Sequence, residues 1–444
     1  MMLTAMPKYE AYKDSGVEWI GDIPAHWNIR KLKYISNINN QTLPENTAGD
    51  FLFDYVDIGS VTLENGVEKV ETFRFSDAPS RARRLAKQGD TVVSTVRTYL
   101  KAISYVDRKS SEYIYSTGFA VINPKDENSS KYLTHFIKSD AFTNQVDDVA
   151  KGISYPAINS SELSNLLVVE PSTPEKNAIA DFLDEKTAKI DDAIAIKERQ
   201  IALLNERKQI LIQQAVTQGL DPNVPMKDSG VAWIGKIPKH WEYRKIKYFI
   251  EVLPGFAFKS QDYSNNPEDL KLLRGINVSP DQIKWDDTVF WPKEKTAGLD
   301  SFMLKKGDLV IAMDRPWVSS GIRIAEIQKD DLPCLLLQRV GRIRGGSELS
   351  TEYVKLLLST NLFLSYFEPM LTGISVPHIS TDQIEQFCCP IPSIKEQNDI
   401  LQFIRNEMTQ FEKTLSIQKY EIDKLKEYKT TLINSAVTGK IKVV

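Results

Sequence analysis

Apolar side chains recur with a period of about 3.5 residues along two stretches of the chain, residues 174–216 and 395–437. Neither stretch contains Pro or Gly after its first residue, so each is predicted to form one continuous helix of roughly 60 Å. The steps alternate between four and three residues, as in helices that pack on a partner helix. The first seam consists of Leu183, Thr187, Ile190, Ile194, Lys197, Ile201, Leu204, Lys208, Leu211 and Ala215. The second seam consists of Ile404, Met408, Phe411, Leu415, Gln418, Ile422, Leu425, Lys429, Leu432 and Ala436.

Polar residues interrupt both seams at the same heptad positions, Lys197 with Gln418 and Lys208 with Lys429. Because the seams match, we expect the helices to pack on each other, antiparallel about a pseudo-two-fold axis. The alternative is that each helix packs on its own domain. Thr173 and Ser393 are the predicted N-caps.

Segments outside the two helices also occur in two similar copies. Residues 13–35 (KDSGVEWIGDIPAHWNIRKLKYI) match residues 227–249 (KDSGVAWIGKIPKHWEYRKIKYF). GISYP at 152–156 matches GISVP at 373–377, and the two copies then run without a gap to the ends of the helices. Between these paired ends, residues 36–151 and 250–372 hardly resemble each other. Such a tandem duplication indicates one framework that presents two different surfaces.

The variable segments contain short runs of β-branched and aromatic residues separated by turn signals. Strands are predicted at 51–56, 91–96, 113–122, 309–313 and 334–342, and short helices at 130–146 and 350–368. The predicted fold class is therefore α+β, with two mixed globules joined by two long antiparallel helices. The predicted division is residues 1–170 and 221–392 for the globules, with 171–220 and 393–444 for the helical segments.

The chain has 444 residues, 42% of them hydrophobic, and a net charge of −3, which is an ordinary soluble composition. Any binding to nucleic acid must therefore come from local basic patches. Three Cys without a CxxC pair and four His predict neither a structural metal nor a disulfide framework. With no signal-peptide core or long apolar run, we expect a cytoplasmic protein that makes no contact with a membrane.

One motif occurs in both variable segments, at 89–99 and 307–317. A Gly-Asp turn leads into a buried strand, which delivers Arg97 or Arg315, and an aromatic residue, Tyr99 or Trp317, follows two positions later. Arginine can pair with guanine O6 and N7, and an aromatic ring can pack on bases or sugars, so these residues are candidate DNA contacts. The alternative is a structural ion pair beside a core aromatic.

Other candidates for DNA binding are basic residues near this motif and polar residues of the repeated GISxP loops. Some of the basic residues are expected to contact phosphates, which position a protein without specifying sequence. They are Arg74, Arg81, Arg83, Arg84 and Lys101 in the first copy and Arg274, Lys305 and Lys306 in the second. The loop candidates are Lys151, Ser154, Tyr155, Ser375 and His378, unless these loops only close the domain as rigid turns.

One stretch of the second variable segment is similar to a catalytic motif. Asp314-Arg315-Pro316-Trp317 is similar to the DPPW motif of amino-group DNA methyltransferases, but Arg replaces one Pro and no glycine-rich loop for S-adenosylmethionine follows a strand. A stand-alone methyltransferase is therefore the weaker alternative. His26 and His240 are interpreted as framework residues rather than catalysts, and Trp19, Trp27, Trp233 and Trp241 as apolar anchors of the framework.

Taken together, the chain resembles the specificity subunits of type I restriction-modification systems. The resemblance rests on SGVEWIGDIPAHW and SGVAWIGKIPKHW, on the AVTQGL and AVTGKI helix ends, and on the PPLxEQ pattern, which Glu396-Gln397 matches and Glu175-Lys176 departs from by one residue. It covers nearly the whole chain.

The resemblance implies that each variable domain reads one half of a bipartite double-stranded DNA site and that the helices set the gap. It also implies two methylation subunits and restriction subunits as partners. S-adenosylmethionine, ATP and Mg are then expected on the partner subunits, with no cofactor in this chain and no reaction of its own. A scaffold that binds only protein is the remaining alternative.

Overall fold

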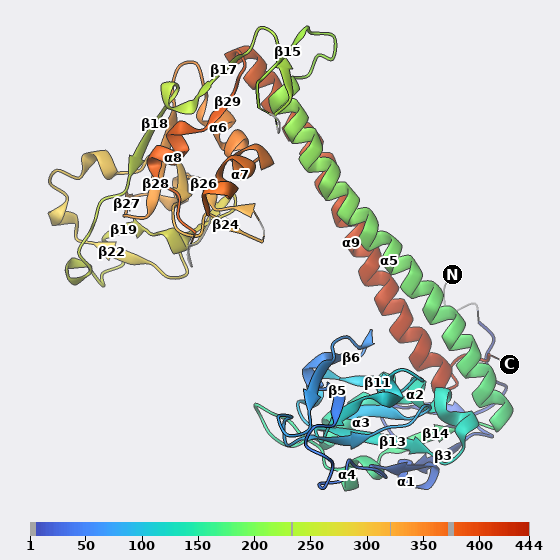
Figure 1. Cartoon of the computed structure of the whole chain (residues 1–444). Coiled ribbons are helices and arrows are strands. Elements are labelled where there is room, and N and C mark those ends of the chain that lie inside the picture. The colour runs from blue at the N-terminus through green and yellow to red at the C-terminus, as the bar shows by residue number, and fades with distance from the viewer. Residues whose placement is uncertain (1–5, 232–233, 320, 372–376, 444) are drawn as a thin grey trace. The chain divides into compact units, whose positions relative to one another are not determined.

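The computed structural model describes residues 6–231, 234–319, 321–371 and 377–443. The chain forms two compact units, each of which includes part of both long helices. The first unit comprises Met1–Glu198 and Lys419–Val444, and the second comprises Arg199–Gln418. Each is described by itself below, with elements labelled as in Figure 1.

The described part of the first unit is built around two four-stranded sheets, ordered β11-β10-β13-β4 and β8-β5-β12-β9, and three strand pairs, β14-β3, β1-β2 and β6-β7. Its strands are β1 Tyr12–Asp14, β2 Asp22–Pro24, β3 Asn28–Lys31, β4 Ser36–Ile38, β5 Leu52–Val56, β6 Val61–Thr62, β7 Gly66–Val67, β8 Glu71–Arg74, β9 Ala82–Leu85, β10 Thr91–Ser94, β11 Ile103–Tyr105, β12 Ile114–Ser116, β13 Phe119–Pro124 and β14 Leu167–Glu170. Its helices are α1 Leu32–Ile35, α2 Ser130–Lys138, α3 Asp140–Val149, α4 Ser160–Ser164 and the first part of α5 Thr173–Gln218.

The second unit contains a four-stranded sheet, β18-β28-β23-β26, a three-stranded sheet, β22-β19-β27, and the pairs β17-β29 and β15-β16. Its strands are β15 Met226–Asp228, β16 Lys236–Pro238, β17 Glu242–Lys245, β18 Ile250–Pro254, β19 Leu270–Leu273, β20 Val278–Ser279, β21 Gln282–Ile283, β22 Val289–Trp291, β23 Leu309–Ala312, β24 Trp317–Val318, β25 Gly321–Ile322, β26 Ile324–Glu326, β27 Cys334–Leu336, β28 Val340–Gly345 and β29 Cys388–Ile391. Its helices are α6 Thr351–Leu358, α7 Asn361–Phe367, α8 Thr381–Gln386 and the first part of α9 Ile394–Val437.

The two units share one topology although their variable segments differ in sequence. The order β4-β13-β10-β11 corresponds to β18-β28-β23-β26, and the pair β3-β14 corresponds to β17-β29. The second sheet of each unit contains one parallel pairing, between β5 and β12 in the first unit and between β19 and β27 in the second. The duplication inferred from the framework motifs therefore extends through the variable segments, and the α+β class is confirmed.

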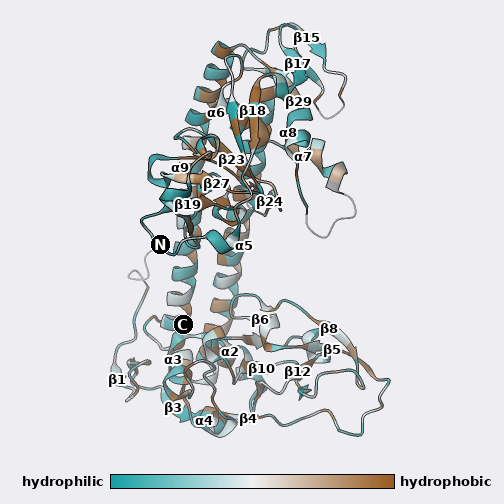
Figure 2. Cartoon of the chain, turned by 90° about the vertical axis from the view of Figure 1, so that its left-hand side faces the viewer, coloured by the Kyte–Doolittle hydropathy of each residue, from teal (hydrophilic) through white to brown (hydrophobic). Residues whose placement is uncertain are grey.

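Alternate side chains of the central strand pack into two different cores in each unit, and Figure 2 shows the hydropathy of the residues along the strands and helices. Val93 of β10 packs with Phe136 of α2 and Phe142 of α3, whereas Val92 packs with Tyr115 of the second sheet. In β23, Ile311 faces the helical core and Val310 the second sheet. This alternation follows from the two-residue period of a strand, and it holds the central strand firmly between two layers.

The predicted helical seams are confirmed in both units. In the first unit, Leu183 and Ile190 of α5 pack with Leu432 and Ala436 of α9. In the second unit, Ala215 of α5 packs with Leu401 and Ile404 of α9. The start of one helix thus lies beside the end of the other, which is the predicted antiparallel arrangement (Figure 1). Two of the polar seam residues form ion pairs: Lys197 Nζ lies 2.5 Å from Glu421 Oε2, and Lys429 Nζ lies 2.7 Å from Asp191.

A hydrogen-bonded cluster anchors the start of each long helix, and we call it the framework clasp. In the first unit, Glu175 accepts hydrogen bonds from Trp27 Nε1 (3.0 Å) and from the Ser172 backbone N–H (3.1 Å) and hydroxyl (2.6 Å). Its Oε1 also lies 2.8 Å from His26 Nε2. In the second unit, Glu396 makes the same four contacts with residues of identical type, Trp241, His240 and both groups of Ser393, at 2.7 to 3.1 Å.

The clasp also corrects two sequence-based predictions. Helix α5 begins at Thr173, so the capping position belongs to Ser172 rather than Thr173, whereas Ser393 has the capping role predicted for it. Trp27 and Trp241 are buried anchors as expected, but Trp19 is 41% exposed, so it is not one of them. Trp233 lies outside the described residues.

Candidate nucleic-acid interface

The repeated Gly-Asp motif forms the same turn in both units. Asp90 accepts a hydrogen bond from the backbone N–H of Lys87 (2.6 Å), and Asp308 accepts one from Lys305 (2.8 Å). Both carboxylates are buried, and the preceding glycines have positive φ of 93° and 87°. Burial raises the pKa of Asp90. These aspartates fix the turn that starts the central strand, so their role is structural.

The central strand then delivers an arginine in a left-handed backbone conformation. Arg97 has φ 52° and Arg315 has φ 46°, and both side chains are exposed. A residue with a Cβ adopts this region at a cost in free energy, and such strained positions are concentrated at functional sites. The shared conformation at equivalent positions favours a functional role for both arginines.

A second loop is joined to each arginine segment by the same backbone bonds. Ile158 N–H donates to Thr95 O and Ile379 N–H donates to Met313 O, both at 2.8 Å. Bridges pair Val96 with Ala157 and Asp314 with His378. The repeated GISxP loops therefore end beside the arginines, a contact between distant segments that the sequence did not predict. We call the combined surface, 95–99 with 151–157 or 313–317 with 377–378, the reading edge.

In the first unit, the reading edge combines a cation with exposed aromatic rings. The Arg97 guanidinium lies 5.2 Å from the centre of the Tyr155 ring, and Tyr155 and Tyr99 are both more than half exposed. Ser154 is exposed beside them. Lys151 pairs with Glu162 at 2.7 Å but keeps 80% of its side chain exposed. This set can stack on bases or sugars and contact phosphates.

In the second unit, the reading edge carries more charge. Arg315 is exposed, and Asp314 Oδ1 lies 2.7 Å from His378 Nδ1 and 3.6 Å from Arg339 Nη1. Trp317 differs from its counterpart Tyr99, because its ring stacks on Phe367 with centroids 5.3 Å apart. This contact favours a packing role for Trp317. Ser375 lies outside the described residues.

Most of the other basic candidates of the first unit are spread around the sheet β8-β5-β12-β9. Arg74 is exposed at the end of β8, and Arg81 pairs with Asp57 at 3.3 Å. Arg83 lies over the Phe75 ring at 4.6 Å. Arg84 is partly buried, and burial lowers the pKa of its guanidinium. Lys101 lies 3.9 Å from Asp140. Of this group, Arg74 and Arg81 retain the exposure that a phosphate contact needs.

In the second unit, the structure separates the basic candidates from the reading edge. Lys305 and Lys306 are exposed but precede β23, whereas Arg315 follows it. Arg274 pairs with Asp287 at 2.8 Å. Arg342 is buried and donates hydrogen bonds to Glu251 and to the carbonyl of Ser301, and Arg344 donates to the buried carboxylate of Asp308. Arg274, Arg342 and Arg344 therefore form ion pairs within the unit and have a structural role.

Arg339 of the second unit was not among the candidates selected from the sequence. Its backbone carbonyl accepts from Met313 N–H (2.9 Å), just as Gly118 O accepts from Thr95 N–H (2.8 Å). Because Arg339 and Gly118 are different residue types, a comparison of the two sequence copies does not align them. Their equivalence is visible only in the backbone hydrogen bonds between the strands.

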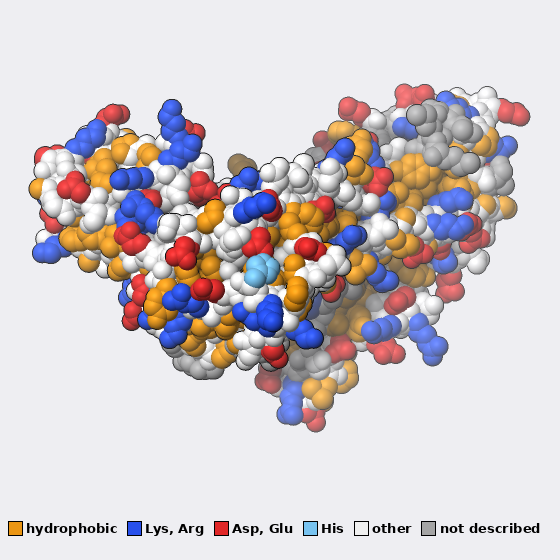
Figure 3. Space-filling view, turned by 90° about the horizontal axis from the view of Figure 1, so that it is seen from above, with side chains coloured by type: hydrophobic (Ala, Val, Ile, Leu, Met, Phe, Trp, Pro, Cys, Tyr) orange, Lys and Arg blue, Asp and Glu red, His pale blue; other side chains and the backbone are white. Residues whose placement is uncertain are grey.

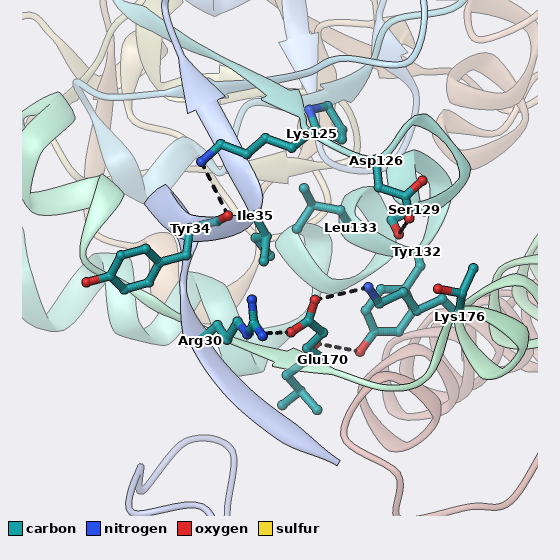
Figure 4. Close-up of a pocket in the computed structure, with 13 residues that line it drawn as sticks. Arg30, Tyr34, Ile35, Lys125, Asp126, Ser129, Tyr132, Leu133, Glu170 and Lys176 are labelled. Atoms are coloured by element: carbon teal, nitrogen blue, oxygen red, sulfur yellow. Dashed lines mark hydrogen bonds and ion pairs between the residues drawn. The ribbon is translucent and has the colours of Figure 1, made fainter.

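Charges of both signs are interspersed over the face drawn in Figure 3, which agrees with local contacts rather than one broad basic field. A cavity of about 270 Å³ in the first unit lies elsewhere, between β3, β14, α2 and the start of α5 (Figure 4). There Glu170 pairs with Arg30 (2.8 Å) and Lys176 (3.3 Å), and Lys125 donates to the backbone carbonyl of Lys33 (2.9 Å).

Within the described residues, no three or more His, Cys, Asp or Glu side chains are grouped so as to hold a metal ion. No described helix combines the length and apolar character of a membrane span.

Comparisons with known proteins agree with this arrangement. A sequence profile described as "Type I restriction modification DNA specificity domain" matches residues 24–206 and 238–427. The MjaVIII specificity subunit of Methanocaldococcus jannaschii is 28% identical over 66% of this chain and 66% of its own length, and the EcoAI specificity subunit of Escherichia coli 29% over 53% and 39%. The MjaX specificity subunit of M. jannaschii, described as putative, is 22% identical over 96% of both chains.

Solved structures share the fold. A chain from a study of complex assembly and conformational transition of the type I R-M system superposes with a TM-score of 0.71 at 18% identity, covering 94% of this chain and 98% of that one. The HsdS subunit from Thermoanaerobacter tengcongensis gives 0.53 at 19% identity with the same coverage.

Proposed function

Because this chain belongs to the type I restriction-modification DNA specificity family, with two matched specificity domains in one polypeptide, we propose that each unit reads one half of a bipartite site in double-stranded DNA. The observation that carries the proposal is the repeated reading edge. Arg97 and Arg315 occupy the same left-handed position at the ends of corresponding strands, and the segment around each is hydrogen-bonded to a second loop.

The reading edges share a backbone but differ in side chains, which is what two different half-sites require. Arg97, Tyr99 and Tyr155 offer one cation and two rings. Arg315, Asp314 and His378 offer polar groups that accept and donate hydrogen bonds. Base edges in the major groove are distinguished by such hydrogen bonds and by contacts with the thymine methyl group.

The long helices have exposed apolar side chains in addition to their shared seam. In the first unit these are Ile196 and Tyr420, and in the second Leu203, Ile210 and Ile417. An apolar helix surface exposed to water favours burial against another protein. The helices thus serve as docking surfaces for two methylation subunits and set the gap between the half-sites, and restriction subunits join that assembly.

The chain itself supplies recognition rather than chemistry. Specificity subunits recognise DNA within the type I enzyme and carry no catalytic site, which removes the support for a stand-alone methyltransferase or a protein-only scaffold. Asp314, the first residue of the methyltransferase-like motif, contacts His378 and Arg339. S-adenosylmethionine, ATP and Mg are then bound by the partner subunits, and the complex acts in the cytoplasm.

A binding selection on random duplexes tests the proposal. The chain is purified with its methylation partner, and the bound DNA is sequenced. We expect two conserved blocks separated by a fixed gap. Arg97→Ala should relax one block and Arg315→Ala the other, while Lys236→Ala, which removes an exposed framework lysine, should leave both blocks unchanged. Binding without any conserved block contradicts the proposal.

A further inference from the structure

The second unit brings three separate segments together around one carboxylate. Asp314 follows strand β23, Arg339 lies in the turn between β27 and β28, and His378 follows the second loop. Asp314 Oδ1 lies 3.6 Å from Arg339 Nη1 and 2.7 Å from His378 Nδ1. The carboxylate therefore lies within ion-pair distance of the Arg339 guanidinium, whose Nη1 also lies 3.5 Å from His378 Nδ1.

The Arg339 backbone is strained in the same way as that of Arg315. Its φ is 70°, in the left-handed region, and its side chain is 60% exposed. An ion pair this exposed adds little to the stability of a fold, so stability alone does not account for the strained arginine. Strain at an exposed, oriented side chain instead indicates a binding role.

The first unit has no equivalent of this group. At the matching backbone positions it carries Gly118 in place of Arg339, Val96 in place of Asp314 and Ala157 in place of His378. A Cβ added to Gly118 would lie 2.4 Å from Ile58 Cδ1, so a side chain there would require the end of the Ile58 side chain to move. The two units therefore differ at this point both in chemistry and in backbone conformation, because Arg339 has φ 70° whereas Gly118 has no positive φ.

We propose that Arg339 reads a guanine in the half-site of the second unit and that Asp314 is its positioning residue; this inference rests on the proposed function. A guanidinium held in one plane can donate two hydrogen bonds to guanine O6 and N7, which is the commonest specific contact in the major groove. A phosphate contact requires charge but no such fixed plane. The first unit reads its half-site without this contact.

The test is the same binding selection, now with the variants Arg339→Gly, Arg339→Gln and Asp314→Asn. The glycine variant copies the first unit, and the glutamine variant keeps a side chain in case glycine loosens the turn. We expect both Arg339 variants to lose the preference for guanine at one base pair by roughly tenfold or more. Asp314→Asn should weaken the same preference less, and the half-site of the first unit should be unaffected. Lys236→Ala, which removes an exposed framework lysine of the same unit, is the matched control for charge.

Two results overturn the inference while leaving the proposed function intact. One is a bipartite preference that Arg339→Gly and Arg339→Gln leave unchanged. The other is an equal loss of affinity for every sequence, together with a shallower dependence on salt, which is the behaviour of a phosphate contact. A wild-type protein that selects no sequence overturns both proposals.

Discussion

Trp27 donates its indole hydrogen to Glu175 Oε1 at 3.0 Å, across 148 positions of sequence. The same bond joins Trp241 to Glu396 at 2.9 Å. Each unit thus ties its N-terminal framework segment to the first turn of a long helix through one carboxylate.

Glu175→Gln is expected to destabilise the first unit near neutral pH by about 1–3 kcal/mol, because hydrogen bonds to a charged acceptor are lost. Burial alone would raise the pKa of Glu175, but hydrogen bonds from Ser172, Trp27 and His26 outweigh it and lower the pKa to about 2. A depressed pKa gives stability that is present above about pH 4.5 and lost as the pH falls toward 2.

Urea denaturation of wild type and Glu175→Gln between pH 7 and pH 2.5 measures this effect. The difference in free energy of unfolding should shrink over the lower part of the range. Glu198→Gln, an exposed position of the same helix, serves as the control. A difference that stays constant with pH shows that the Glu175 charge is not responsible.

Arg344→Ala is expected to destabilise the second unit by about 3–5 kcal/mol, because it leaves the Asp308 carboxylate, 4% exposed, without its guanidinium. Arg315→Ala, which removes an exposed arginine at the reading edge, should change stability by less than about 0.5 kcal/mol. Chemical denaturation followed by circular dichroism compares the two variants. Equal losses would show that Arg315 also has a structural role.

Lys197→Leu is expected to stabilise the first unit by about 1 kcal/mol, because an apolar side chain replaces a partly buried ammonium in the seam. A higher urea midpoint with unchanged helical circular dichroism is the expected result. Ile190→Lys is the opposite substitution in the same seam and should be destabilising. If Lys197→Leu is destabilising instead, the pair with Glu421 contributes more than the seam.

Seven residues inserted after Leu204 and seven after Leu425 preserve the heptad phase of both helices. If the helices set the gap, the preferred gap should grow by roughly three base pairs, at 1.5 Å per helical residue and 3.4 Å per base pair. Methylome sequencing of cells that express the variant reads the gap directly. The same insertion after Asn65, in the loop between β6 and β7, should change nothing. An unchanged gap in the double insertion excludes the spacer role.

The sequence predicted what local periodicity and repetition encode. The heptad seams, the two copies and the buried strands Thr91–Ser94 and Leu309–Ala312 follow directly from those patterns. The boundaries of the short helices could not be predicted from those patterns. The expected helix 130–146 is two helices, because Ser139 has an extended backbone and caps the second one, and the segment 350–368 is interrupted in the same way at Thr360.

The reading edge was only partly predictable. The sequence selected Arg97, Tyr155, Arg315 and His378, but not that the strand end and the loop meet. Arg339 and Asp314 are 25 positions apart and come together only through the register of β23 and β28. A left-handed backbone conformation at an arginine cannot be predicted from the residue type, because glycine is the residue that usually adopts this conformation.

The framework clasp has a consequence for inheritance. Its members lie outside residues 36–151 and 250–372, so their bonds do not depend on which variable segment the gene carries. Recombination between the paired framework stretches would replace one variable segment with a foreign one and leave the bonds of the clasp in place. A single genetic exchange would then change half of the recognised sequence, and a host lineage would acquire a new specificity without first losing a folded protein.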